Sequence, residues 1–313
     1  MPVTVFAGSD ALRLALRLQS PGDCVVASNW NGPGSVLIEP DVAHRTRECP
    51  CCAIRLDLVD GLLRAARRAR RPRRILLVAD PSDDLTTMTY TLLSDADLAR
   101  HVRLDGVVMA VDAVAAATRI AAPGLLGNEL ELDALAVADV IVLGRSGELT
   151  TDGFGRLVSA LRDVNQVGHV CAPALSLRGD DRPDDDVVMG LDAWHGAPTV
   201  STAVPSVSRS DRDDVPDTVV LRQAAPLDPD AIDEWLTWLV DTHARRLLRM
   251  QGALAVVSAS ARVCCHGVRS FAMSHSEAAD PVTSRRNDSL VIVVGHGLDV
   301  DELSSGFAAT RAR

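Results

Sequence analysis

Lysine is absent from the 313 residues, so every basic side chain other than histidine is arginine. Arginine carries a planar, permanent charge and does not replace a lysine ammonium where a site needs a compact point charge. The sequence also lacks an uncharged apolar run of the ~18 residues that cross a membrane, so we expect no transmembrane helix. Residues 3–7 predict a strand without a basic leader, which indicates no signal peptide and favours a cytoplasmic protein.

Cysteine is scarce and unevenly distributed. An odd total of seven, partly clustered, argues against a disulfide framework. Three of the seven, Cys49, Cys51 and Cys52, fall within four residues immediately before a predicted helix. Thiolates at short spacing favour zinc, and a helix N-terminus favours the thiolate of Cys52. We predict a zinc site here, with three ordinary loop thiols as the alternative. Candidates for a fourth ligand are His44, Glu48 and Cys171.

The formal net charge of −10 argues against general nucleic-acid binding. Against that background, arginines crowd residues 67–74. Such a run could contact phosphates, or it could be the solvated end of a helix that Pro72 terminates. The second interpretation is favoured, and a local phosphate contact stays open.

Alternation of strand and helix patterns predicts an α/β fold with a mainly parallel sheet and helices on both faces. The strands carry continuous apolar runs, which is typical of such sheets. They are predicted at 3–7, 24–27, 36–38, 75–78, 104–112 and 140–143, and helices at about 54–63, 85–100, 129–138 and 151–164.

The pattern changes after residue 175. Polar stretches at 178–186 and 206–217 predict loop and linker. Beyond them we expect an α+β unit, with a helix that starts at Asp228-Pro229 and carries Leu247. Its strands are predicted near 218–222, 253–257, 262–266, 269–273 and 289–294, and a last helix at about 299–311. The predicted domains are 1–205 and 218–313, with 206–217 as linker.

Two further groups of polar side chains have ordinary explanations. Cys264, Cys265 and His266 could contribute to a site, but a core strand with buried thiols is favoured. The acidic residues of 180–186 favour a solvated loop over a cation site. No Ser-His-Asp arrangement can be identified from spacing.

Three stretches give the chain a family resemblance. Residues 49–58 match the Cys-x-Cys-Cys motif and following helix of the CobW family of P-loop GTPases. Residues 104–113 are similar to the family's strand that leads to its metal-side switch, and 290–299 to its closing strand and Gly-Arg-Gly-Leu-Asp turn. The resemblance implies a P-loop-GTPase-like N-terminal domain, a smaller CobW-like C-terminal domain and a metallochaperone-type role.

The nucleotide motifs of that family are missing. Residues 8–12 are too few for Gly-x4-Gly-Lys-Ser/Thr, and Asp10 would repel phosphate. The Asn-Glu-Phe-Gly segment of the family is 29–32 here, without its carboxylate. Residues 75–82 lack the Walker B Glu and Gly, and 144–147 replace the guanine-reading Asn-Lys-x-Asp. We therefore expect zinc but not GTP or Mg²⁺ as cofactor, and no GTP hydrolysis.

Three functions stay open. The leading hypothesis is a zinc metallochaperone or zinc-responsive recruitment factor that needs no nucleotide, with a client or recruited protein as partner. A similar combination of motifs occurs in an actinobacterial branch linked to zinc limitation, whose mycobacterial members help recruit a ribosome-hibernation factor, so ribosome-associated proteins are among the expected partners. The alternatives are an active GTP-dependent metallochaperone and a metal-free protein-binding scaffold.

Overall fold

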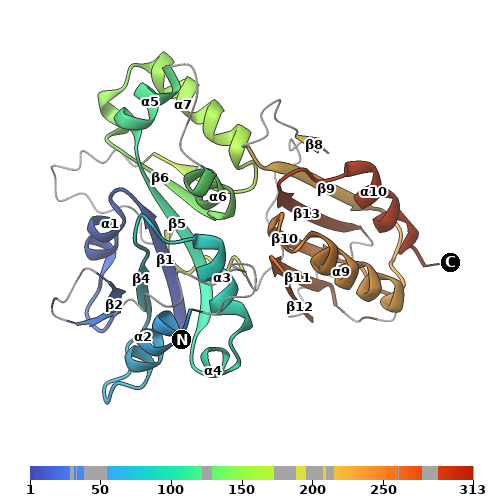
Figure 1. Ribbon diagram of the computed structural model, residues 1–313, viewed down its shortest axis with the longest axis horizontal. Coiled ribbons are helices and arrows are strands. Elements are labelled where there is room, and N and C mark those ends of the chain that lie inside the picture. The colour runs from blue at the N-terminus through green and yellow to red at the C-terminus, as the bar shows by residue number, and fades with distance from the viewer. Residues whose placement is uncertain are drawn as a thin grey trace. The chain divides into compact units, whose positions relative to one another are not determined.

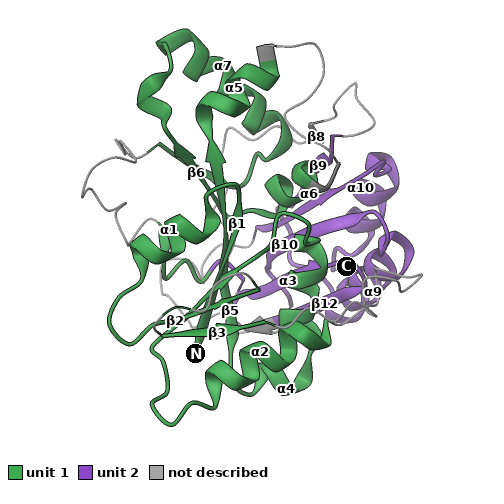
Figure 2. Cartoon of the chain, turned by 60° about the vertical axis from the view of Figure 1, so that its left-hand side comes forward, with its two compact units in different colours: residues 1–192 green, residues 193–313 purple. Residues whose placement is uncertain are grey.

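The computed structural model divides the chain into two compact units, Met1–Asp192 and Ala193–Arg313 (Figure 2). It describes residues 1–28, 32, 34–38, 55–121, 129–172, 188–194, 207–208, 215–257, 259, 261–276 and 288–312. The predicted metal ligands His44, Glu48, Cys49, Cys51 and Cys52 lie outside the described residues, as does the acidic loop 180–186. None of the described helices is both long and apolar enough to span a bilayer.

Unit 1 is built on a parallel sheet of seven strands in the order β3-β2-β4-β1-β5-β6-β7 (Figure 1). Strands such as 24–27 and 75–78 are buried along their whole length, which explains their uninterrupted apolar sequences. The predicted parallel sheet is therefore confirmed. Its strands are β1 Pro2–Gly8, β2 Cys24–Ala27, β3 Ser35–Leu37, β4 Ile75–Val78, β5 Arg103–Asp112, β6 Val140–Gly144 and β7 His169–Cys171.

Helices cover both faces of this sheet. The apolar face of α1 packs with Phe6, Val25 and Leu76 on one side. On the other side α2 approaches so closely that a Cβ on Gly61 would lie 3.7 Å from Val26. The helices of unit 1 are α1 Ala11–Leu18, α2 Leu56–Ala66, α3 Leu85–Ser94, α4 Ala96–Ala99, α5 Ala113–Ala121, α6 Glu129–Val137 and α7 Thr151–Val164.

A buried carboxylate holds the last part of unit 1 against β5. Asp105 is 2% exposed and accepts hydrogen bonds from the hydroxyl of Thr4 and from the backbone N–H groups of Gly190, Leu191 and Asp192. Gly106 leaves the space into which Leu191 packs, since a Cβ there would lie 2.5 Å from its side chain. This carboxylate thus accepts hydrogen bonds from the backbone N–H groups of residues 190–192, which lie outside any strand or helix.

Unit 2 is an antiparallel sheet of six strands in the order β12-β11-β10-β13-β9-β8, with α9 and α10 packed on it (Figure 1). Asp228 caps α9 by accepting hydrogen bonds from the N–H groups of Asp230 and Ala231, and Pro229 occupies the first turn, as predicted. The elements are β8 Val207–Ser208, β9 Asp217–Gln223, β10 Leu247–Leu254, β11 Val263–Val268, β12 Phe271–Ser276, β13 Ser289–Gly295, α9 Pro229–His243 and α10 Val300–Ala309.

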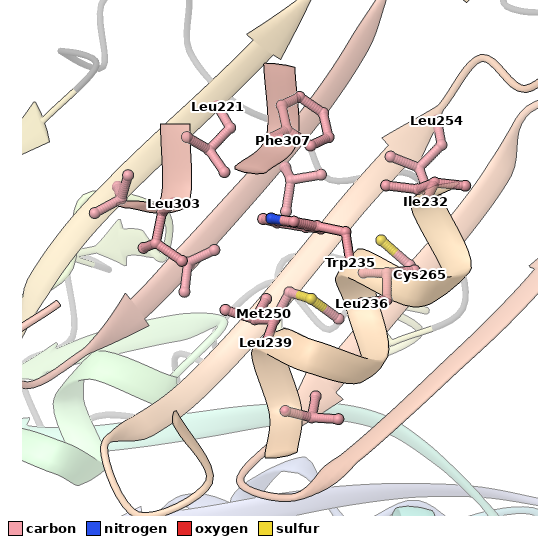
Figure 3. Packing of buried hydrophobic residues seen from close by; sticks show 14 of the residues in the cluster. Leu221, Ile232, Trp235, Leu236, Leu239, Met250, Leu254, Cys265, Leu303 and Phe307 are labelled. Carbon is pink, nitrogen blue, oxygen red and sulfur yellow. The ribbon is translucent and has the colours of Figure 1, made fainter. Parts of the chain in front are cut away.

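The core of unit 2 lies between the sheet and its two helices (Figure 3). Trp235 of α9 and Phe307 of α10 meet with ring centroids 5.2 Å apart. Cys265 is fully buried beneath α9, and burial raises the pKa of its thiol to about 12. Cys264 is equally buried, so the interpretation of this strand as a core strand with buried thiols is confirmed.

Two predicted boundaries differ from the structure. Leu247 begins β10 instead of extending α9, and the strand expected at 253–257 is β10, Leu247–Leu254. The helix stops at His243, and the residues after Arg246 form β10, which pairs with β13 and β11. β8 lies within the residues predicted as linker, and the second compact unit comprises Ala193–Arg313.

Candidate functional site

The carboxyl edge of the parallel sheet is the natural place for a site, because ligands of open α/β sheets bind outside the carboxyl ends of the strands. Parallel pairing brings the ends of all seven strands of unit 1 to this edge. The segments that leave it include the turn after β1, the loop after β4 and the turn after β6.

The turn after β1 is very short. Only Ser9 and Asp10 separate the end of β1 from the start of α1. Gly8 has φ 98°, and a Cβ on it would lie 2.0 Å from the carbonyl oxygen of Ala110 on β5. Only glycine fits this close approach. A phosphate-wrapping P-loop needs several residues between its strand and helix, so this turn has no room for one.

A carboxylate-rich loop follows β4. The hydroxyl of Ser28, just after β2, donates a 2.5 Å hydrogen bond to Asp80. The backbone N–H of Asp80 donates to Asp83 at 2.8 Å, and Asp84 caps α3. These contacts fix the loop and place three carboxylates, Asp80, Asp83 and Asp84, close together in sequence at this edge.

Arg55 ties the start of α2 to the same loop. Its guanidinium donates to Asp57 at 2.7 and 3.2 Å and to Asp83 at 2.6 Å. The three side chains are 17%, 4% and 11% exposed, respectively. Burial opposes the charge on Arg55, but the hydrogen bonds and charges of Asp57 and Asp83 outweigh it and raise its pKa. The network anchors Arg55, which is three residues after Cys52.

Arg145 lies at the carboxyl edge, directly after β6, and contacts the end of β5. It adopts a left-handed conformation, φ 59°, at the start of a 3-10 turn, Ser146–Glu148. Its guanidinium pairs with Asp112 at 2.9 Å and with Glu148 at 2.8 and 3.0 Å. Burial raises the pKa of Asp112, but the N–H of Ala115 and the Arg145 guanidinium outweigh it and lower the pKa overall. Two carboxylates therefore share the positive charge of Arg145.

Metal-binding residues do not converge within the described ranges, where no three histidine, cysteine or carboxylate side chains form a possible metal cluster. Cys171 ends β7 at the carboxyl edge, half-buried, and burial raises the pKa of its thiol. The prediction of a site at Cys49, Cys51 and Cys52 concerns residues that the structure does not describe, so it stays a prediction.

Comparisons with known proteins agree with this architecture. The family model for the CobW/HypB/UreG nucleotide-binding domain matches residues 41–170, and the model for the cobalamin synthesis protein CobW C-terminal domain matches 217–311.

Two solved structures share the fold over the whole chain. The Zn(II)-bound YjiA GTPase from E. coli aligns with TM-score 0.70 and 19% identity, over 100% of this chain and 99% of that one. A Zn(II)-bound YjiA triple mutant, with one glutamate and two cysteines changed to alanine, aligns with TM-score 0.71 and 18% identity over the same shares. With a CobW nucleotide-binding domain followed by a CobW C-terminal domain, this chain belongs to the CobW family.

Proposed function

We propose that this CobW-family protein is a cytoplasmic zinc-binding protein of zinc homeostasis that works without a nucleotide cycle. Zinc is its cargo or signal. It delivers the ion to a client protein, or it recruits a partner in response to zinc, with ribosome-associated proteins among the candidates. The observation that carries the nucleotide-independent part is the two-residue turn between β1 and α1.

The chemistry of phosphoryl transfer explains why that turn matters. Transfer depends on backbone N–H groups that wrap the phosphates, on a lysine and on Mg²⁺. Ser9 and Asp10 are too few to form the wrap, and the chain contains no lysine. The CobW nucleotide-binding model also begins its match at residue 41, beyond this turn.

Charge at the carboxyl edge supports the same conclusion. Carboxylates gather at the carboxyl edge, where ligands of open α/β sheets bind. Arg55 and Arg145 offer little compensation, because each already pairs with two carboxylates. An incoming phosphate would have to displace these partners, and like charges repel it. The carboxylates of this edge are Asp10, Asp80, Asp83, Asp112 and Glu148.

The zinc part rests on the donor set and on the Arg55 anchor. Cys49, Cys51 and Cys52 supply three soft donors at short spacing, and structural zinc sites close with a fourth ligand. Arg55, three residues after Cys52, is held in place by its ion pairs. His44, Glu48 and Cys171 are the candidates for the fourth position, and an open fourth position would suit transfer of the ion to a client.

Zinc stoichiometry tests the metal part. Under reducing conditions we expect about one Zn²⁺ per chain, lost in the Cys49→Ser/Cys51→Ser/Cys52→Ser variant and kept in Cys24→Ala, which changes a buried thiol of β2. Zinc must be counted per chain, since a YjiA mutant without two cysteines is also described as Zn(II)-bound. Full stoichiometry in the triple variant would refute the proposed site.

Isothermal titration with GTP–Mg²⁺ tests the nucleotide part. We expect no saturable heat at micromolar concentrations, with or without zinc. An active GTP-dependent metallochaperone is the second candidate, because both structural neighbours are described as GTPases. A saturable micromolar heat would establish that alternative. If the wild-type protein bound neither zinc nor GTP, the third function, a metal-free scaffold, would remain.

A further inference from the structure

A patch of arginines lies at the opposite, amino edge of the parallel sheet. The arginines lie on the loop that connects the end of α2 to the start of β4 (Figure 1), and all of them are exposed. We call the following five residues the arginine patch: Arg67, Arg68, Arg70, Arg71 and Arg73.

Four carboxylates of unit 1 pair with arginines outside the patch. The pairs are Asp60–Arg64 at 3.0 Å, Asp23–Arg74 at 2.8 Å, Asp97–Arg100 at 3.0 Å and Asp192–Arg103. Within the described part of the chain, no carboxylate forms an ion pair with a member of the patch. A net charge of −10 overall therefore coexists with a local group of five uncompensated cations.

Helix geometry explains only part of this group. Arginines in or just after the last turn of a helix stabilise its carboxyl end, which accounts for Arg67 and Arg68. Arg70, Arg71 and Arg73 lie beyond α2, where the helix dipole has little effect. The side chain of Arg71 donates to the carbonyl of His101 at 3.3 Å, and the N-terminal amine of Met1 donates to the same oxygen at 3.2 Å. Further positive charge thus adjoins the patch.

The backbone that carries the patch is held in place. The N–H of Arg67 donates to Leu63 at 2.9 Å, and the N–H of Arg73 donates to Gly22 at 2.8 Å. Pro72 is buried between exposed neighbours. A fixed loop presents its guanidinium groups with less loss of entropy on binding than a free tail would.

From these observations we propose that the arginine patch binds the phosphodiester backbone of a nucleic-acid duplex, without reading its sequence. Guanidinium forks match phosphate oxygens, and clustered exposed arginines are the electrostatic footprint of backbone contact. Residues 67–74 contain no aromatic side chain, so they offer no platform for base stacking. The large exposed apolar residues among those described, Leu56 and Val257, lie outside this loop, which favours a polyanion over a membrane.

The acidic carboxyl edge does not cancel this attraction at moderate salt. β1 spans seven residues between the two edges, or about 20 Å at ~3.3 Å per residue. The Debye length is about 10 Å at 0.1 M salt, so the distant carboxylates are largely screened. The proposal depends neither on zinc nor on the nucleotide edge, and its test can fail without affecting the proposed function.

The test measures fluorescence anisotropy of labelled 20-base-pair RNA and DNA duplexes between 50 and 200 mM salt. Five phosphate contacts predict a slope of log K against log salt of about −4.5, which is roughly a 500-fold loss over this range. In Arg70→Gln/Arg71→Gln/Arg73→Gln we expect a slope of about −1.8 and only a tenfold loss. Comparison of the dissociation constants for the RNA and the DNA duplex shows which of the two is preferred.

The matched control changes three exposed arginines of α5 and α7, as Arg119→Gln/Arg156→Gln/Arg162→Gln, with the same change in net charge. It should bind like the wild type, and circular dichroism should show all variants folded. No saturable binding at 50 mM salt, or equal slopes for the two triple variants, would overturn the proposal. Binding to phosphatidylserine vesicles but to neither duplex would also overturn it, in favour of a membrane surface.

Discussion

Removing the guanidinium of Arg55 should destabilise unit 1 far more than removing an ordinary surface charge. In Arg55→Ala, Asp57 and Asp83 lose the positive charge that they share. Both carboxylates are largely buried, because their side chains are only 4% and 11% exposed. Breaking a buried ion pair from one side costs about 3–5 kcal/mol. The two carboxylates keep hydrogen bonds from the N–H groups of Leu58 and Asp80. We therefore expect a loss of about 2–4 kcal/mol in the free energy of unfolding.

Urea denaturation followed by circular dichroism measures this loss, provided that the slope m is unchanged. Arg64→Ala, in the last turn of α2, is the matched control. Its partner, Asp60, lies 3.0 Å away, but the two side chains are 45% and 69% exposed, so about 0–1 kcal/mol is expected. Equal effects of the two substitutions, or a loss below 1 kcal/mol in Arg55→Ala, would refute the role given to burial.

Three further predictions concern other positions. Gly8→Ala should lower the urea midpoint strongly, because φ is 98° and the new Cβ would meet a carbonyl at 2.0 Å, whereas Gly147→Ala has open space and should be near neutral. Asp105→Ala should make residues 190–192 sensitive to limited proteolysis, since three N–H groups lose their acceptor, while Asp105→Asn should protect them partly. Burial lowers the pKa of His243 in the folded protein, so the unfolded chain binds a proton there more readily at acid pH. Stability of unit 2 should therefore fall as pH drops below about 6.5, and pH-dependent urea midpoints should lose this trend in His243→Gln.

The parallel sheet could be predicted because its strands are short, apolar and buried on both faces. The helix at Pro229–His243 could be predicted because its first residues carry an aspartate cap and a proline. The helix at Ala113–Ala121 was missed, since its alanine-rich sequence forms a helix readily but shows little contrast between apolar and polar faces. The strand at His169–Cys171 is too short for any periodicity.

The candidate site was less predictable because its parts are distant in sequence. Arg55 and Asp83 meet across 28 positions, and Arg145 and Asp112 across 33. No local pattern signals such pairs. Asp105 offered a signal that was not used, a carboxylate within an otherwise apolar strand, which must find donors when it is buried. The shortness of the segment after the first strand, in contrast, is visible in the sequence, and the structure has two residues between β1 and α1.

The distribution of charge connects the two proposals. In a P-loop GTPase the carboxyl edge of the sheet must attract phosphate, which requires uncompensated positive charge there. In this protein the arginines at that edge, Arg55 and Arg145, are each paired with two carboxylates, while the arginine patch at the other edge forms no ion pair with a described carboxylate. A phosphate-bearing ligand should therefore prefer the amino edge. A competition experiment can test this preference for the amino edge. GTP–Mg²⁺ at millimolar concentration should displace the duplex from the arginine patch only weakly, by the same amount as a simple salt of equal ionic strength. Arg145→Ala should leave the duplex affinity unchanged. If Arg145→Ala weakened duplex binding as much as the patch variant does, the phosphate-binding surface would have to lie at the carboxyl edge instead.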